Sequence, residues 1–74
     1  MLEQLAEIFS EYVDIELSEV KAESYFSQDL AFNSYDFMCM LSSVGDEFEV
    51  KIPETELANL FTVKDLMDYI EEHK

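Results

Sequence analysis

One apolar stripe in the middle of the chain most constrains what this sequence can fold into. Its residues recur at spacings of three, three and four, which is the repeat of one α-helical face. They are Met38, Leu41, Val44 and Phe48, and Phe37 and Met40 widen the stripe. We therefore predict a helix over residues 34–48, which Ser34 opens and a polar loop precedes.

Three other segments also have helical patterns. Residues 2–13 hold a second stripe, made of Leu2, Leu5, Ile8, Phe9, Tyr12 and Val13. Residues 63–72 hold a third, made of Val63, Leu66, Met67 and Ile70, and Thr62 with Asp65 resembles a capping start. A short helix is predicted over residues 54–60, because Pro53 suits a first-turn position.

The segment between the first two of these helices lacks a clear period. Residues 14–33 scatter apolar side chains among acids and serines, and this is a long stretch for a structureless connection. We expect a short helical turn near residues 18–22, with apolar side chains pinning the rest to the protein. Phe26 and Leu30 are predicted to fill the core.

Together these patterns predict an all-α fold. No segment alternates convincingly in the manner of a strand. We expect one domain, residues 1–74, folded as a small four-helix bundle with three main helices, one short helix and a long loop between the first and second helices. A chain this short buries only roughly 60% of its unfolded surface, so a deep catalytic cleft is not expected.

Acidity is the strongest compositional signal. Eighteen Asp and Glu residues face four Lys and no Arg, so the net charge is −14. Nucleic acid is not an expected partner, because phosphate contacts need clustered cations, and an anionic membrane surface would repel the chain. Two interpretations stay open: the acidity fits a basic patch on a partner protein, or it simply keeps the domain soluble.

Other sequence features bear on location. Cys39 is the one cysteine, so we expect a reducing compartment and a buried structural thiol. No run of about 18 apolar residues is available to span a bilayer. The first residues lack the basic start of a signal peptide. We therefore expect a cytoplasmic protein, and we expect it to be a monomer.

Residues for catalysis or metal binding do not occur in usable combinations. His73 is the one histidine, and we expect it in an exposed tail, where it cannot readily serve Ser34 or Cys39 as a base. With a single glycine there is no phosphate-binding loop. Paired zinc ligands and a calcium-loop motif are also missing. We predict no catalytic residues, no metal site and no enzyme activity.

Ser34 is open to two interpretations. Serine is a common helix cap, and such a cap would stabilise the helix by about 1 kcal/mol. Alternatively, its hydroxyl could carry a covalent group, since a phosphodiester on this oxygen would lie near the free backbone N–H groups of a helix start. The local pattern alone favours the cap.

Three segments carry a resemblance that changes this balance. Residues 29–36 (DLAFNSYD) resemble the D-L-G-x-D-S-L-D signature of acyl carrier proteins. Residues 46–53 (DEFEVKIP) are similar to the family's E-E-F-x-x-x-I-P segment, and residues 62–70 (TVKDLMDYI) to its T-V-x-D-x-x-x-Y-I ending. Over its whole length the chain thus resembles the acyl carrier protein family of phosphopantetheine-binding carrier domains.

The resemblance implies a non-catalytic carrier. A phosphopantetheinyl transferase would move 4′-phosphopantetheine from coenzyme A onto Ser34, and acyl intermediates of fatty acid, polyketide or specialised lipid biosynthesis would be held on this arm as thioesters. The bundle would shelter the acyl chain. Acyl-loading and acyl-processing enzymes with basic patches would dock on the helix after the serine, at Tyr35, Asp36, Phe37, Asp46 and Glu47.

Departures from the family pattern leave the partners open. Asn33 replaces the usual acid before the serine, Tyr35 replaces the usual leucine after it, and Cys39 and Gly45 stand where acids are common. The docking face is therefore less acidic than usual, which fits a dedicated pathway as well as housekeeping synthesis. An aminoacyl or peptidyl carrier and an unmodified carrier-like adaptor remain as alternatives.

The net charge generates a first prediction about stability. At −14 the folded domain repels itself, and dissolved ions screen that repulsion. We expect the melting temperature, measured by circular dichroism, to rise with added sodium chloride or with a divalent cation. A melting temperature that stays constant from low to high salt would contradict the prediction.

Overall fold

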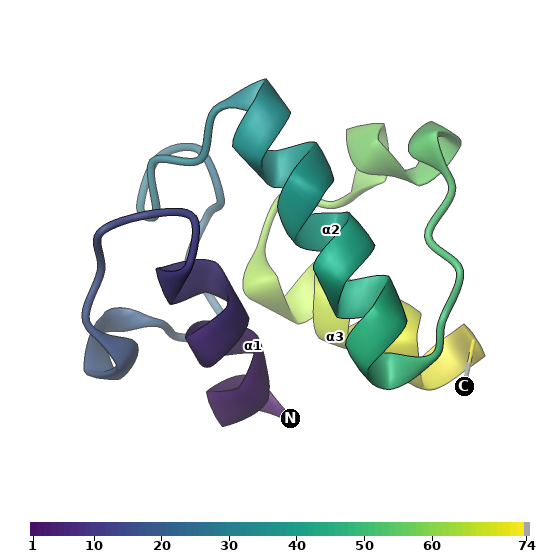
Figure 1. Ribbon diagram of the computed structural model, residues 1–74, viewed down its shortest axis with the longest axis horizontal. Helices are drawn as coiled ribbons and strands as arrows, with labels where there is room; N and C mark the ends of the chain where they lie inside the picture. Colours follow the sequence, from purple (N-terminus) through teal and green to yellow (C-terminus); the bar gives the residue numbers. More distant parts are fainter. Residues whose placement is uncertain (74) are drawn as a thin grey trace.

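The computed structural model describes residues 1–73, and Lys74 lies outside this range. Helices dominate the described residues: α1 (Leu2–Ser10), η1 (Leu17–Glu19), α2 (Ser34–Phe48), η2 (Glu54–Asn59) and α3 (Val63–His73), where η denotes a 3₁₀-helix. Figure 1 shows α2 as the long central element, with α1 on its left, η2 on its right and α3 passing behind its lower part. The predicted all-α bundle with a long loop between its first two main helices is confirmed.

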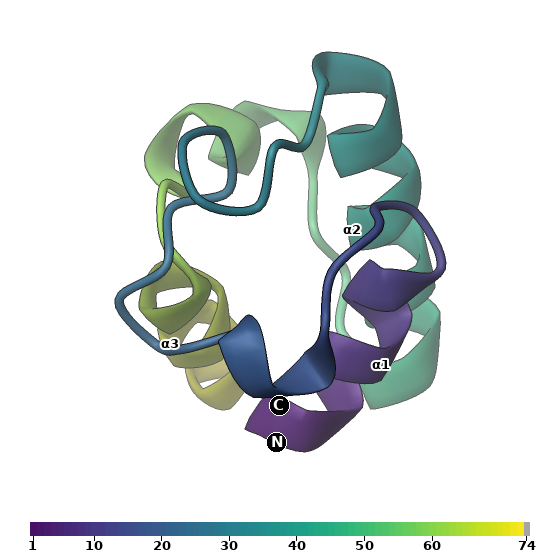
Figure 2. The ribbon, with the colours of Figure 1, turned by 90° about the vertical axis from the view of Figure 1, so that its left-hand side faces the viewer.

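The core lies where the apolar sides of the helices meet. Its fully buried large side chains come from all three α-helices and the long loop: Phe9, Leu5, Leu30, Met40, Leu66, Ile70, Val44 and Val63. α1 packs directly against α2, as both ribbon views show (Figures 1 and 2). The apolar stripe of α1 is therefore core, since a domain of this size has little other apolar surface to bury.

α1 is shorter than predicted, because it ends at Ser10 instead of residue 13. The chain tightens there into turns, with the Glu11 N–H donating to the Ile8 carbonyl at 3.1 Å and the Tyr12 N–H donating to the Phe9 carbonyl at 3.0 Å. Tyr12 remains packed against the core, and its hydroxyl donates to the Cys39 carbonyl at 3.3 Å. The helical spacing of apolar residues in the sequence therefore extends beyond the residue at which the helix itself ends.

The long loop is tied to the start of α3 by backbone hydrogen bonds. The Phe26 N–H donates to the Phe61 carbonyl at 3.0 Å, and the Val63 N–H donates to the Ser24 carbonyl at 3.0 Å. Phe26 and Leu30 are buried, as predicted. The expected turn near residues 18–22 lies slightly earlier, as η1, and the rest of the loop is irregular but fastened (Figure 2).

The inward face of α2 is rotated from the predicted one. Met40 is completely buried, whereas Met38 is 45% exposed, so the prediction that Met38 faces inward is wrong. The same rotation leaves Cys39 half-buried, which corrects the expectation of a buried thiol. The spacing of apolar residues allowed either face, and packing against α1 and the loop selected the one centred on Met40, Leu41 and Val44.

The C-terminal elements differ from the predictions mainly at their ends. The segment after Pro53 is a 3₁₀-helix that ends at Asn59, and Pro53 lies just before its first turn. α3 extends to His73, one residue further than predicted. The predicted cap is confirmed, because Thr62 Oγ1 accepts from the Asp65 N–H at 3.2 Å and the Asp65 carboxylate accepts from the Thr62 N–H at 3.1 Å.

Tyr69 joins α3 to the extended segment after α2. Its hydroxyl donates to the Lys51 carbonyl at 3.0 Å. Burial, with a contribution from Glu56, raises the pKa of this phenol above its usual range. A phenol is already neutral at physiological pH, so this side chain remains a hydrogen-bond donor there, and the raised pKa extends that state to more alkaline solution.

Gly45 allows the chain to fold back at the end of α2. The next segment reverses at Glu49, which adopts a left-handed conformation with φ of 56°, and the Val50 N–H then donates to the Gly45 carbonyl at 2.9 Å. A Cβ at position 45 would lie 2.7 Å from the Val50 carbonyl oxygen, which is closer than van der Waals contact allows. Only glycine fits this approach without movement of the backbone.

We predict that Gly45→Ala destabilises the protein, by about 1–3 kcal/mol, because the added methyl group forces the Val50 backbone away. In an unobstructed helix the same change stabilises by about 1 kcal/mol, so the sign of the effect is diagnostic. Urea unfolding followed by circular dichroism measures it. Ser42→Ala, at an exposed position of α2, is the control and should be neutral or slightly stabilising. A stabilising Gly45→Ala would contradict the packing described here.

Candidate functional site

Ser34 is the first residue of α2, and it is exposed. The cap is its neighbour Asn33, whose Oδ1 accepts from the Asp36 N–H at 2.7 Å. The interpretation of Ser34 as the cap is therefore wrong, since Asn33 fills that position with an extended backbone. The Ser34 hydroxyl lies at the surface and does not cap the helix.

The start of α2 is electrostatically suited to an anion. The backbone N–H groups of a helix's first turn point out of its end and carry partial positive charge. Asp36 adds a negative charge in this turn, but its carboxylate is held by the Asn33 side-chain amide at 3.2 Å. A phosphate on the Ser34 hydroxyl would therefore be attracted by the helix end, while the carboxylate of Asp36 would partly oppose it.

An aromatic hollow of about 220 Å³ lies beside Ser34. It is lined by the loop, by the start of α2 and by the η2–α3 junction: Tyr25, Phe26, Ser27, Phe32, Asn33, Ser34, Phe37, Leu60 and Phe61. Beneath it, the rings of Phe26 and Phe37 lie 5.0 Å apart between centroids, and Phe32 lies 6.0 Å from Phe26. These packed rings form a rigid floor under the serine.

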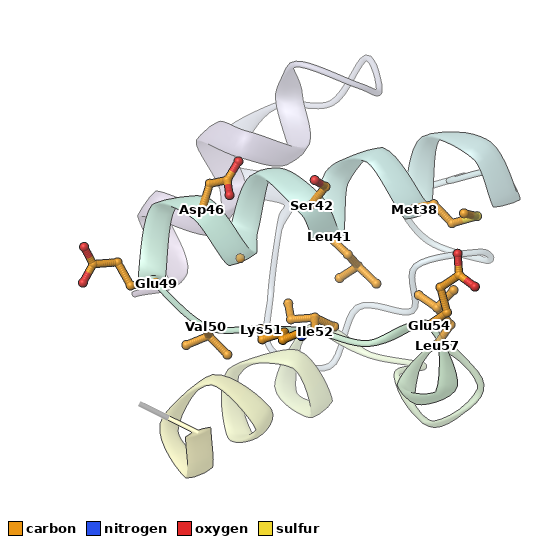
Figure 3. Close-up of a pocket in the computed structure, with 11 residues that line it drawn as sticks. Met38, Leu41, Ser42, Asp46, Glu49, Val50, Lys51, Ile52, Glu54 and Leu57 are labelled. Atoms are coloured by element: carbon orange, nitrogen blue, oxygen red, sulfur yellow. The ribbon is translucent and has the colours of Figure 1, made fainter.

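A larger groove, of about 610 Å³, lies between α2 and the segment that follows it, residues 49–57. Figure 3 shows Met38 and Leu41 of α2 facing Ile52 and Leu57 across it. Acidic side chains stand at its edge, among them Asp46, Glu49 and Glu54. The groove therefore combines apolar walls with a mostly acidic rim, and it begins one helical turn after Ser34.

Comparison with known proteins identifies this arrangement. Residues 3–70 match the family model described as a phosphopantetheine attachment site. The acyl carrier protein of Micrococcus luteus is 39% identical over 71 residues, which cover 96% of this chain and 88% of that protein. The acyl carrier protein of Myxococcus xanthus is 40% identical over 95% of this chain and 89% of its own length. The chain belongs to the acyl carrier protein family.

A solved structure gives the same result for the fold. The thermally stable acyl carrier protein from Enterococcus faecalis superimposes with a TM-score of 0.81 and 29% sequence identity, over 99% of this chain and 92% of that one. The chain thus has an acyl carrier role, with phosphopantetheine as its covalently attached prosthetic group. Carrier proteins of this family work by interacting with partner enzymes.

The predicted docking residues of this carrier protein fall into two separate groups. Tyr35 is exposed, and Asp36 and Phe37 are half-buried, at the Ser34 end of α2. Asp46 and Glu47 are exposed near its other end, about 15–18 Å further along the helix axis at the usual helical rise. A partner that uses both groups must therefore cover most of the length of α2.

Exposed aromatic residues beside Ser34 include two that the sequence analysis did not select. Tyr25 and Phe61 lie in irregular segments, where no periodicity marks a side chain as inward or outward. The hydrogen bonds between the long loop and the start of α3 bring them to the same hollow. No local sequence signal could have located them there, because their proximity depends on a long-range contact.

His73 is exposed, as predicted, but it belongs to α3 instead of a tail. Its ring stacks on Tyr69 at a centroid distance of 4.0 Å, and Nδ1 lies 2.9 Å from the Tyr69 carbonyl oxygen. The end of α3 is at the opposite end of the molecule from the start of α2 (Figures 1 and 2). His73 is therefore not placed to act on Ser34.

Within residues 1–73, no group of three or more His, Cys, Asp or Glu side chains is arranged to hold a metal ion. Among the same residues, no helix is long and apolar enough to cross a bilayer. The candidate site consists of Ser34, the start of α2 and the two neighbouring hollows.

We predict that Asn33→Ala and Ser34→Ala differ in their effect on stability. Removing the Asn33 cap should cost about 1 kcal/mol, because the Asp36 N–H loses its partner. Removing the exposed Ser34 hydroxyl should change stability by less than about 0.5 kcal/mol. Urea unfolding of the two purified variants measures both values, and a larger loss for Ser34→Ala would show that serine is the cap.

Proposed function

We propose that Ser34 is the attachment oxygen of this acyl carrier protein, and that the chain is a carrier and not itself a catalyst. The observation that supports this most strongly is the exposed Ser34 hydroxyl at the start of α2, which the Asn33 cap leaves unused. It stands inside the segment that matches the family signature. When bound, the prosthetic group supplies a terminal thiol that holds acyl groups as thioesters.

The surroundings of Ser34 fit a phosphopantetheine group. The exposed hydroxyl is open to a modifying enzyme, and the backbone N–H groups at the start of α2 favour the phosphodiester charge. In the attachment reaction, Ser34 Oγ attacks the pantetheine-bearing phosphorus of coenzyme A. A new O–P bond forms, the P–O bond to the adenosine half breaks, and that half leaves as a nucleotide. The serine proton passes to a base of the transferase.

We assign the groove between α2 and residues 49–57 to the acyl cargo. Measured by the helical rise, Met38 lies about 6 Å and Asp46 about 18 Å along α2 from Ser34, so the groove extends away from the attachment point. The walls formed by Met38, Leu41 and Ile52 are apolar, and the methionine can adapt to cargo of different shape (Figure 3). An apolar acyl group is the ligand that such walls favour.

We infer that the partners are a phosphopantetheinyl transferase and acyl-transferring enzymes with basic docking patches. The charge of −14 supports this, because opposite charge on a partner speeds encounter and keeps exchange between partners fast. Tyr35, Asp36 and Phe37 would meet the partner near the serine, and Asp46 and Glu47 would meet it further along α2. We further propose that the chain works as a monomer in the cytoplasm, in keeping with its lone thiol.

We predict that the purified chain gains one phosphopantetheine group when incubated with coenzyme A, Mg²⁺ and a broad-specificity phosphopantetheinyl transferase. Intact-mass spectrometry measures the gain. Ser34→Ala should abolish it completely, because no other residue supplies the attachment oxygen.

Two controls make this test specific. Ser42→Ala removes another exposed serine of α2 and should leave the gain unchanged. Circular dichroism should show that Ser34→Ala is folded, as expected for an exposed side chain. Modification that persists in Ser34→Ala, or a wild-type chain that is never modified by several transferases, would refute the proposed attachment site.

A further inference from the structure

We propose that an apolar collar around Ser34, made of Tyr25, Tyr35, Met38 and Phe61, is the surface that the phosphopantetheinyl transferase grips. The inference rests on the proposed function of Ser34. Five large hydrophobic side chains are exposed within residues 1–73, and four of them form this collar. Their exposed fractions are 46% for Tyr25, 75% for Tyr35, 45% for Met38 and 62% for Phe61.

The collar is assembled from three parts of the chain. Tyr35 follows Ser34 directly, and Met38 lies one turn further along the same side of α2. Tyr25 and Phe61 line the same hollow as Ser34. An isolated bridge between Tyr25 and Thr62 and the hydrogen bond from the Phe26 N–H to the Phe61 carbonyl hold the two segments that carry these residues next to each other.

Two of these side chains, Tyr25 and Phe61, line a hollow whose floor is already filled by buried rings. Phe26 and Phe32 are buried there and pack edge to face against Phe9, each with its ring centroid 5.7 Å from that of Phe9. Tyr25 and Phe61 therefore stand on a rigid floor and cannot turn inward without displacing buried rings. In a chain of net charge −14, such concentrated apolar exposure indicates a contact surface.

Because the collar surrounds Ser34, we expect its partner to be the transferase that modifies this serine. An enzyme that acts on the Ser34 hydroxyl must bring its own atoms into contact with that oxygen, and so it covers the side chains around it. Tyrosine and phenylalanine lose little conformational entropy when they are buried at an interface, and tyrosine is among the residues that most often dominate binding energy. The fitting surface on the transferase is apolar around the entrance to its coenzyme A site.

The collar also divides α2 into two kinds of contact. Close to Ser34 the exposed side chains are mostly apolar, whereas Asp46 and Glu47 lie about 18 Å and 20 Å further along the helix axis. Apolar contacts are not screened by salt, and contacts between exposed charges are. The contribution of the collar to recognition should therefore persist at high salt, while that of Asp46 and Glu47 should fade.

The test measures kcat/KM for modification of the apo protein by a phosphopantetheinyl transferase, at low and high salt. Phe61→Ala should lower kcat/KM about tenfold through KM, since truncating an interface aromatic commonly has an effect of this size or larger. Tyr35→Ala, at the most exposed collar position, is a second variant that is safe for folding. Phe61→Leu should recover most of the loss.

Leu17→Ala is the matched control, because Leu17 is the fifth exposed large hydrophobic residue, is 49% exposed and lies on η1 outside the collar. It should leave kcat/KM within about twofold of wild type. The pair Asp46→Asn and Glu47→Gln should reduce kcat/KM at low salt only. All variants are first checked for folding by circular dichroism.

The possible outcomes separate this inference from the proposed function. A wild-type chain that is modified at Ser34 while Phe61→Ala and Tyr35→Ala stay within about twofold of it would overturn the collar alone. An equal loss of kcat/KM in Leu17→Ala would also overturn the collar. Because the substrate is the apo protein, a loss cannot come from an arm packing on the collar. A different result would assign the collar to the attached arm. In that case the collar substitutions would leave kcat/KM unaltered and would change backbone NMR shifts only in the modified protein.

Discussion

The fold depends on the attachment of its long loop to the start of α3. Backbone hydrogen bonds from Phe26 to Phe61 and from Val63 to Ser24 fix residues that are 35 and 39 positions apart in the chain. They place buried Phe26 under the start of α2 and so decide where Ser34 lies. Without them the loop would lack a partner for its backbone groups, and the serine would stand at the end of an unsupported segment.

A second constraint comes from the small size and high charge of the domain. Nearly all of the apolar residues on the helices are needed for one thin core, so the large apolar side chains that remain exposed are the informative ones. Four of the five exposed large hydrophobic side chains within residues 1–73 gather near the serine, whereas acidic side chains cover much of the remaining surface. The two surfaces suit different tasks in a carrier: charge favours rapid encounter, and apolar contact favours a specific orientation at the reacting hydroxyl.

The residues at the site show how far sequence patterns reach. The segment around Ser34, the helix that follows it and the cap formed by Thr62 and Asp65 could be read from local spacing, because capping and helical periodicity act over a few residues. The local pattern favoured Ser34 as the cap, but Asn33 is an equally good capping residue and occupies that position. Met38 was placed in the core although it is exposed, since its spacing is compatible with either edge of the apolar face.

The sequence by itself determined the helical class, the approximate extent of the three main helices, the acidic character and the family, because these follow from local periodicity, composition and motifs. Only the tertiary structure decided which face of α2 turns inward, that Gly45 must accommodate the Val50 carbonyl, and that Tyr25 and Phe61 stand beside Ser34. The reason is physical. Helical spacing is a property of neighbouring residues, whereas burial and proximity depend on which distant segments the folded chain brings into contact.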